Sequence, residues 1–154
     1  MKNSPNCFAK AVDLLARRAH GTSELIEKLK KFYSEEEITP TIERLKELDF
    51  LNDQKYAEDY VRNRIKFKKK GIFMIKNELL KKRIPRDIIQ AACADRDEEE
   101  KISATEFLTK KLESLIRKTK DRQKIKLSLM RSGLSRGFAS QLVQEIVQSL
   151  CTSL

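Results

Sequence analysis

The sequence has 154 residues, with 33 Lys and Arg against 23 Asp and Glu, which gives a formal net charge of +10. This length suits one domain or an array of small repeats, and a hydrophobic content of 40% can form a core. Four glycines, three prolines and no tryptophan argue against a turn-rich β-sandwich or a low-complexity chain. No apolar run approaches the roughly 18 residues that a membrane span needs, and the N-terminus lacks a secretory signal pattern. We therefore expect a soluble, cytoplasmic, all-α protein without membrane contact.

The cysteines and the single histidine offer little for catalysis. Cys7, Cys93 and Cys151 are widely spaced and form no CxxC pair, which is typical of free thiols in a reducing cytosol. A zinc site needs about four nitrogen or sulfur ligands, and no Gly-rich phosphate loop is present. A cysteine paired with His20 as nucleophile and base is formally possible, but a lone histidine is more often a surface or capping residue. We expect no enzyme activity, catalytic residue, metal or cofactor.

Helical periodicity runs through most of the sequence and predicts nine helices. Their approximate ranges are 6–18, 23–32, 34–48, 53–69, 72–82, 85–93, 97–119, 121–133 and 135–150. Glycines follow or end three of these ranges, and we expect Gly21 to be a left-handed stop for the first helix, Gly71 to end the fourth and Gly133 to end the eighth.

Polar residues mark several helix N-termini. Residues 34–37 form a capping box, Ser-Glu-Glu-Glu, and Asp121 is expected to cap the eighth helix. Asn52 and Asp53 are expected to cap the fourth, with Asp53 a cap rather than a contact residue. Pro40 leaves two alternatives open for the third helix: it is kinked, or it starts after residue 39 with Pro40 in its first turn.

Apolar residues recur at an interval of 50 residues. The matched sets are Leu15, Ile65 and Leu115; Leu25, Ile75 and Ile125; Leu29, Leu79 and Leu129; and Ile38, Ile88 and Phe138. A three-helix unit of this size cannot bury its apolar face alone, so we interpret the pattern as three stacked copies. The predicted fold is an all-α, elongated and curved array of three tandem three-helix repeats, at residues 1–51, 52–96 and 97–154.

The positive charge is concentrated in two stretches. Residues 62–83 contain ten basic side chains and one acid, and residues 110–131 contain nine basic side chains and two acids. Lysines at helix C-termini, where they meet the negative end of the helix dipole, explain part of this excess but not its continuation into the next helix. We favour electrostatic binding of nucleic acid or a nucleoprotein over a merely solvated surface. Three aromatic residues lie nearby: Tyr60 is predicted to be core, Tyr56 is left open, and Phe67 could stack on bases.

Three segments resemble the bacterial RecX regulatory protein family. Residues 20–29, HGTSELIEKL, resemble its HSxxELxxKL segment. Residues 51–61, LNDQKYAEDYV, are similar to the family's L[ND]DxxYAxxYVxxR…G…IxxEL core, which continues here through Arg64, Gly71 and residues 75–79. Residues 122–124, with Leu129 and Gly133-Leu134, resemble the third-repeat stretch RxKxxxxLxxRGF.

Three departures from the family pattern question the local turn geometry. Gly21 replaces the serine that usually follows the histidine, and Asp49-Phe50 replaces the glycine before residue 51. Arg83-Ile84 stands where the family often has Lys-Gly-Ile, so a favoured helix-ending glycine is missing.

The resemblance implies a fold of three tandem three-helix repeats, in agreement with the 50-residue interval. It also implies a non-enzymatic, monomeric regulator that binds the RecA recombinase filament on single-stranded DNA. Such a regulator would modulate, and by our expectation inhibit, ATP hydrolysis and strand exchange in recombination, DNA repair and the SOS response. The alternatives are a stand-alone basic DNA-binding protein and a helical-repeat scaffold for an acidic protein partner.

We expect the filament to be contacted through the second and third repeats, with nonspecific electrostatic contact to single-stranded DNA. The predicted contact residues are Arg64, Lys68, Lys69, Lys70, Lys118, Lys120, Arg122, Lys124 and Tyr56.

Overall fold

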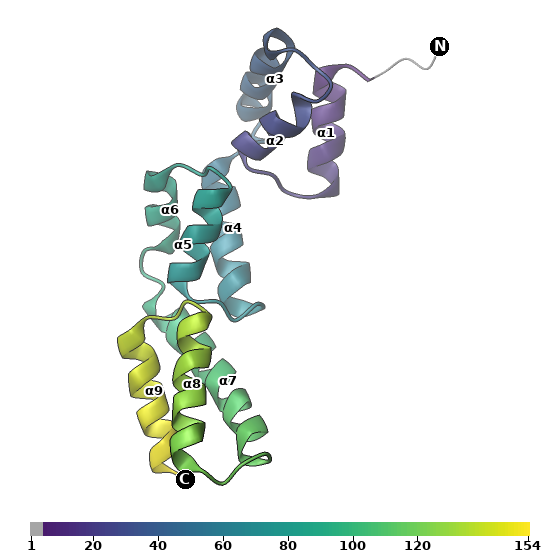
Figure 1. Cartoon of the computed structure of the whole chain (residues 1–154). Coiled ribbons are helices and arrows are strands. Elements are labelled where there is room, and N and C mark those ends of the chain that lie inside the picture. The colour runs from purple at the N-terminus through teal and green to yellow at the C-terminus, as the bar shows by residue number, and fades with distance from the viewer. Residues whose placement is uncertain (1–4) are drawn as a thin grey trace. The chain divides into compact units, whose positions relative to one another are not determined.

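The computed structural model describes residues 5–154, and every regular element in this part of the chain is an α-helix (Figure 1). The helices are α1 (Cys7–Arg17), α2 (Thr22–Leu29), α3 (Glu35–Glu47), α4 (Asp53–Lys66), α5 (Ile72–Lys81), α6 (Arg86–Cys93), α7 (Asp97–Ile116), α8 (Arg122–Ser135) and α9 (Ser140–Thr152). The all-α class and the predicted order of the helices are confirmed.

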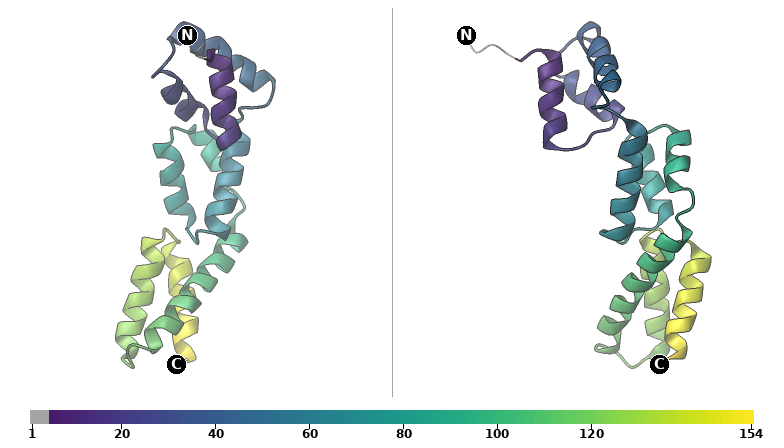
Figure 2. Two further views of the ribbon diagram at one scale, coloured as in Figure 1. Left: turned by 90° about the vertical axis from the view of Figure 1, so that its right-hand side faces the viewer. Right: turned by 180° about the vertical axis from the view of Figure 1, so that it is seen from behind.

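The chain divides into two compact units, and the division passes through the second repeat. Unit 1 comprises Met1–Asp59 with Leu79–Ala92, and unit 2 comprises Tyr60–Glu78 with Cys93–Leu154. In unit 1, α1, α2 and α3 surround a core that includes Leu25, Leu29 and Leu45. In unit 2, α7, α8 and α9 pack together around Leu108, Leu129 and other buried residues (Figure 2).

The 50-residue interval describes the second helix of each repeat. The helices α2, α5 and α8 begin at Thr22, Ile72 and Arg122, and two of the predicted apolar sets on them are fully buried. Those sets are Leu25, Ile75 and Ile125, and Leu29, Leu79 and Leu129. The first and third helices do not begin at this interval, because the helices differ in length: α1, α4 and α7 have 11, 14 and 20 residues, and α2, α5 and α8 have 8, 10 and 14. Phe138 is buried in the loop before α9, so its predicted equivalence to residues inside α3 and α6 is wrong.

A carboxylate from the first helix of one repeat caps the second helix of the preceding repeat. In unit 1, Asp53 Oδ1 accepts a hydrogen bond from the backbone N–H of Thr22 at 2.7 Å. In unit 2, Glu100 Oε1 accepts from the backbone N–H of Ile72 at 2.9 Å. These bonds satisfy N–H groups that the first turn of a helix leaves without a partner.

The third repeat has no repeat after it in the described chain to supply such a carboxylate, and its second helix is capped locally. Asp121 Oδ1 accepts from the backbone N–H groups of Gln123 and Lys124 at 3.0 and 3.1 Å, as predicted. The prediction for α4 needs a correction: Asn52 Oδ1 accepts from Lys55 N–H at 3.1 Å and caps this helix, whereas Asp53 caps α2.

The predicted helix-ending glycines have other roles. Gly21 has φ −75° and ψ 159°, which is extended backbone, and it is the N-cap of α2. Gly133 lies inside α8, where an added Cβ would lie 2.7 Å from Val143 Cγ1, so it permits close packing of α9. Gly71 follows the end of α4 and is required by a close approach, because an added Cβ would lie 2.1 Å from the backbone of Gly137.

Left-handed turns at four helix ends are made by residues other than glycine. Asp49, Lys69, Arg83 and Asp95 have φ values of 57°, 50°, 58° and 57°. Among residues 5–154, Gly137, with φ 84°, is the one glycine in this conformation, which favours glycine. The turns at Asp49 and Arg83 therefore persist where the family pattern has glycine. The backbone geometry is retained at the cost of a less favourable residue.

Helix α3 begins at Glu35 and contains Pro40, so the alternative of a start after residue 39 is wrong. The capping box is present at its N-terminus, where the Glu37 carboxylate accepts a hydrogen bond from the Ser34 backbone N–H at 2.9 Å.

His20 is buried, which corrects its interpretation as a surface or capping residue. Nδ1 lies 2.8 Å from the carbonyl oxygen of Arg18, and Nε2 lies 2.9 Å from Nζ of Lys28. The lysine can only donate, so Nε2 accepts and the ring proton lies on Nδ1. Burial, followed by the positive charges of Arg18 and Lys28, lowers the pKa of His20 despite its hydrogen bond to the Arg18 carbonyl. The side chain is a structural group of the first repeat.

The three thiols are free, with Cys7 and Cys93 buried and Cys151 half-buried. Burial raises the pKa of the Cys93 thiol, which disfavours the reactive thiolate. Within residues 5–154, His, Cys, Asp and Glu form no group of three or more that could hold a metal ion. No helix in the described part of the chain combines the length and apolar character needed to cross a membrane.

Candidate nucleic-acid interface

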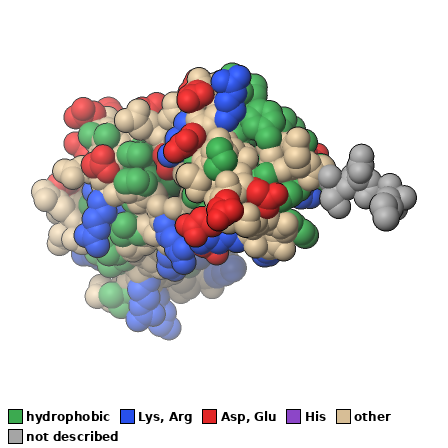
Figure 3. All heavy atoms as spheres, turned by 90° about the horizontal axis from the view of Figure 1, so that it is seen from above, with side chains coloured by type: hydrophobic (Ala, Val, Ile, Leu, Met, Phe, Trp, Pro, Cys, Tyr) green, Lys and Arg blue, Asp and Glu red, His purple; other side chains and the backbone are tan. Residues whose placement is uncertain are grey.

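Nearly all of the net positive charge belongs to unit 2. This unit has 19 Lys and Arg against 10 Asp and Glu, whereas unit 1 has 14 against 13. The view in Figure 3 shows acidic and basic side chains interspersed on the face that it presents. Eight of the nine predicted contact residues lie in unit 2, so the structure concentrates most of the predicted interface in the unit that carries the charge.

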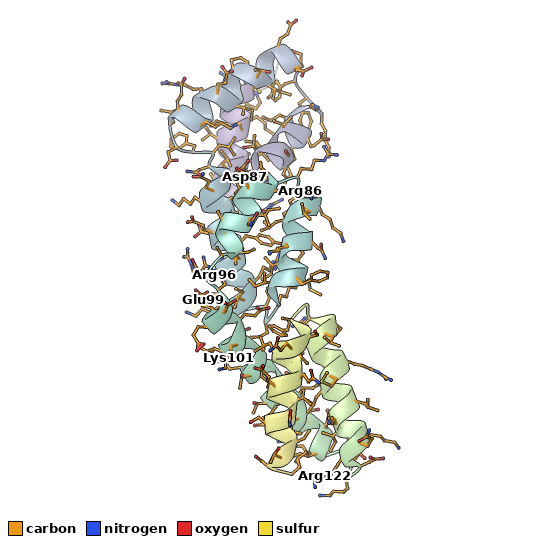
Figure 4. All side chains as sticks on the ribbon, turned by 90° about the vertical axis from the view of Figure 1, so that its left-hand side faces the viewer. Arg86, Asp87, Arg96, Glu99, Lys101 and Arg122 are labelled. Atoms are coloured by element: carbon orange, nitrogen blue, oxygen red, sulfur yellow. The ribbon has the colours of Figure 1, made fainter. Side chains whose placement is uncertain are left out.

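Within unit 2, the predicted basic residues form two clusters at opposite ends of α8. The carbonyl oxygen of Lys68, in the loop after α4, accepts a hydrogen bond from Arg136 Nη2 at 2.8 Å, just beyond the last residue of α8. Arg122 is the first residue of α8 (Figure 4). A helix of 14 residues is about 20 Å long. The predicted basic contact residues of unit 2 therefore form two separate positive sites, one at each end of α8.

In the first cluster, the Glu78 carboxylate engages two of the predicted cations. Arg64 Nε lies 3.4 Å from Oε2, Lys70 Nζ forms an ion pair with Oε1, and the Tyr60 hydroxyl donates to Oε2 at 2.8 Å. Burial alone raises the pKa of this carboxyl. Hydrogen bonds from Lys70 and Tyr60, with the charges of Lys70 and Arg64, outweigh burial and hold the pKa below its ordinary value. Arg64 and Lys70 therefore hold α4 and α5 together.

Tyr60 contacts the same groups and is half-buried, so it lies at the edge of the core, which corrects its predicted place among the buried core residues. The Arg64 guanidinium carbon lies 4.6 Å from the centroid of its ring, a cation–π contact. Burial, with a hydrogen bond to Glu78, raises the pKa of the Tyr60 hydroxyl, so it stays a neutral donor.

Lys69 and Lys68 differ although they are neighbours. Lys69 is half-buried and forms an ion pair with Glu106 of α7. Lys68 is exposed, and no carboxylate of residues 5–154 forms an ion pair with it. Of the four predicted cations in this cluster, Lys68 is therefore the one whose side chain can meet a phosphate without breaking an internal contact.

The second cluster surrounds the loop between α7 and α8. Lys118 and Lys120 are exposed there and form no ion pair within the described residues. Arg122 Nη2 donates to the Cys151 carbonyl at 2.9 Å, near the C-terminus of α9, and Lys124 Nζ lies 3.9 Å from an Asp121 oxygen. An exposed pair at such a distance contributes little stability, so Lys124 can exchange its partner at low cost.

Tyr56 lies on α4, as Arg64 does, but in the part of this helix that belongs to unit 1. It is half-buried and lines a hollow of about 230 Å³ together with His20, Phe50 and Lys55. An added Cβ on Gly21 would lie 3.9 Å from Tyr56 Cε1, so the ring packs beside the start of α2. Its position indicates a packing role in unit 1.

The loop between α4 and α5 and the first turn of α5 also display one exposed aromatic ring each. Phe67 is 68% exposed and Phe73 is 71% exposed. Lys66 Nζ lies 5.4 Å from the centroid of the Phe67 ring, in a cation–π contact. Phe67 was singled out by the sequence, but Phe73 was not, because an aromatic residue in an amphipathic helix is usually buried.

The turn that follows α8 anchors this loop. The backbone N–H of Gly71 donates to the Arg136 carbonyl at 2.8 Å, and that of Phe73 donates to the Gly137 carbonyl at 3.3 Å. The residues involved are Arg136-Gly137-Phe138, which have the letters RGF of the third-repeat family pattern, four residues after the positions that its spacing gives. That literal match was the signal that could have identified the anchor.

The fold defines the class of the protein: an all-α protein of tandem three-helix repeats with a basic second unit. Family models for the first and second three-helix domains of RecX match residues 7–45 and 52–92, respectively. The chain is 33% identical over 144 residues to the regulatory protein RecX of Clostridium botulinum, covering 92% of this chain and 67% of that one. It is 30% identical over 145 residues to the regulatory protein RecX of Prosthecochloris aestuarii, covering 94% and 93%.

Solved structures agree with these sequence matches. The crystal structure of RecX from Lactobacillus salivarius superposes with a TM-score of 0.79 at 28% identity and covers 94% of both chains. A second structure, of a regulatory protein RecX, has a TM-score of 0.78 at 22% identity and shares the fold. The chain belongs to the RecX family.

Proposed function

We propose that this chain is a non-enzymatic regulator that binds the RecA recombinase filament on single-stranded DNA and inhibits its ATPase and strand-exchange activities. Membership of the RecX regulatory family is the observation that carries the proposal. The concentration of positive charge in unit 2 supports it, because such a surface complements both DNA phosphates and acidic protein.

The mechanism follows from differential binding. A ligand shifts a filament between active, inactive and disassembled states only if it binds those states with different affinity. Two positive sites about 20 Å apart could engage points on the filament that lie together in one state and not in another. Inhibition would then require no chemistry by this chain.

The test is the single-stranded-DNA-dependent ATPase rate of RecA, titrated with this protein at ratios far below one copy per RecA. DNA is kept in excess, so competition for the strand cannot account for a loss of rate. We expect strong suppression under these conditions. No effect at near-equal amounts would contradict the proposal.

A charge-reversal pair locates the contact without disturbing the fold. Lys66→Glu with Lys68→Glu changes two exposed lysines, and we expect the concentration for half-inhibition to rise about tenfold, or ~0.7 kcal/mol for each reversed charge. Reversal of Lys69 or Lys70 is avoided, since each would place two carboxylates together at Glu106 or Glu78.

The matched control is Lys31→Glu with Lys46→Glu, which makes the same charge change at two exposed lysines of unit 1. We expect this control to inhibit like the unaltered protein. Equal loss in both double variants would mean that net charge alone matters. The alternative of a stand-alone DNA-binding protein would then be favoured over a filament regulator. Tight binding to DNA in the absence of RecA would identify it.

A further inference from the structure

The segment 67–73, which comprises the loop after α4 and the start of α5, has features that the electrostatic account of unit 2 does not explain. With Phe32, these are the most exposed large apolar side chains of the described residues. Phe67 is the first residue of the five-residue loop after α4, and Phe73 is the second residue of α5. Folding therefore leaves two large apolar side chains uncovered within seven residues of the chain.

The charge around this loop is positive and has few free counter-charges. Lys66, Lys68 and Lys76 are exposed on the elements that carry the rings. The acidic residues nearby are already engaged: Glu78 with Arg64 and Lys70, and Glu106 with Lys69. An apolar surface bordered by lysines suits a ligand that combines flat apolar groups with negative charge.

The backbone of the loop is held in place. Arg136 contacts it twice, through its side chain to the Lys68 carbonyl at 2.8 Å and through its own carbonyl to Gly71 N–H at 2.8 Å. Any side chain at Gly71 would collide with Gly137 at 2.1 Å, so the two turns are in tight contact. Because the backbone is already ordered, binding at the rings incurs a smaller loss of entropy.

We propose that Phe67 and Phe73 are a stacking platform for the bases of single-stranded nucleic acid, with Lys66, Lys68 and Lys76 meeting its phosphates. The inference rests on the proposed function and deepens it, by naming the unpaired strand itself as a ligand of this loop. Every base has a flat face, so stacking gives affinity without sequence preference. A duplex keeps its bases stacked on one another and offers only phosphates.

The absence of tryptophan from the sequence makes a site-specific probe available. Phe67→Trp and Phe73→Trp are made separately, and indole fluorescence is recorded with oligothymidylate, with an abasic strand of equal length, and with duplex DNA, all without RecA. The control is Phe50→Trp, at a ring that is 56% exposed in unit 1 beside Asp49. Circular dichroism and thermal melting establish that each variant is folded.

We expect oligothymidylate to quench the indole emission of the Phe67→Trp and Phe73→Trp variants, while the abasic strand and the duplex leave it nearly unchanged and the Phe50→Trp control does not respond. Phe67→Ala and Phe73→Ala should each weaken oligothymidylate binding about tenfold, within the range measured for base–aromatic stacking. Binding of the abasic strand should hardly change. Equal affinity of the unaltered protein for both strands, or equal quenching of the Phe50→Trp control, would overturn the stacking inference.

This assay contains no RecA, so it is independent of the ATPase test. Suppression of the ATPase with no stacking would overturn this inference and leave the proposed function standing. Stacking without suppression of the ATPase would overturn the proposed function, leave the stacking inference standing and indicate a single-strand-binding protein.

Discussion

At the scale of single residues, the backbone conformation prevails over local preference at the helix ends. Arg83 occupies the left-handed region with φ 58°, at a position where the family pattern favours glycine. A residue with a Cβ is disfavoured there by roughly 1–2 kcal/mol relative to the ordinary helical region. The packing of Ile84, which is 3% exposed, keeps the turn in place. Replacement of such a left-handed residue by glycine should therefore stabilise the protein.

Arg83→Gly should therefore raise the free energy of unfolding by about 1 kcal/mol. The lost ion pair with Glu27 subtracts little, because its side chains are 70% and 56% exposed. Urea unfolding measures the change as a higher midpoint at constant m-value. Lys81→Gly, a matched change in the last turn of α5, should be destabilising by about 0.5–1 kcal/mol. Destabilisation by Arg83→Gly would contradict the prediction.

At the scale of elements, the repeats are joined by side chains that complete a neighbouring helix. Asp53 belongs to α4 yet caps α2, and Glu100 belongs to α7 yet caps α5. Glu100 is 7% exposed, and burial raises the pKa of its carboxyl in spite of the hydrogen bond from Ile72. The second helix of a repeat thus depends on the next repeat for part of its stability, as expected for stacked units that cannot fold alone.

Asp53→Ala should lower the free energy of unfolding by about 1 kcal/mol, since an N-cap acceptor is typically worth that amount. Asp53→Asn keeps an acceptor oxygen toward Thr22 N–H and should cost clearly less. Glu58→Ala, an exposed change in the same helix, is the control and should have little effect. Chemical denaturation measures the stability of the three variants. If Asp53 were merely an exposed charge and not a cap of α2, Asp53→Ala would be as stable as the Glu58→Ala control.

At the scale of the whole molecule, the charge is divided unequally between units of similar size. Unit 1 is nearly neutral, whereas unit 2 has an excess of nine positive charges. Cations held by Glu78 or Glu106 contribute to the general field but are less available for direct contact. Direct phosphate contacts should come mainly from exposed lysines such as Lys66 and Lys68.

Binding of single-stranded DNA should weaken steeply with salt, because each neutralised phosphate releases counterions. The slope of log affinity against log salt is about −0.7 per phosphate contact on a single strand. Lys66→Gln with Lys68→Gln should therefore reduce the steepness by about 1.4. Lys31→Gln with Lys46→Gln should leave the slope unchanged. Fluorescence anisotropy over a salt series measures both, and an equal reduction in the two variants would refute the assignment.

Patterns in the amino-acid sequence were sufficient to identify the helices, the repeat and the family. Helical periodicity and caps such as Asp121 are local signals, because a helix is formed by contacts three or four residues apart. The sets that include Leu25 and Leu29 revealed the 50-residue interval because each repeat buries the same face of its second helix, and these residues are buried as expected. The motifs at residues 20–29 and 51–61 indicated the family to which the chain belongs.

The tertiary structure decided which side chains are available for binding. No local pattern shows that Lys69 meets Glu106, 37 residues away, or that Asp53 caps Thr22, 31 residues away. The anchoring of the Phe73 loop by Arg136 depends on a contact across 68 residues. The sequence gives the charge and size of a side chain, but packing between distant segments decides which groups it contacts. Those contacts determine whether the side chain remains available to bind a ligand.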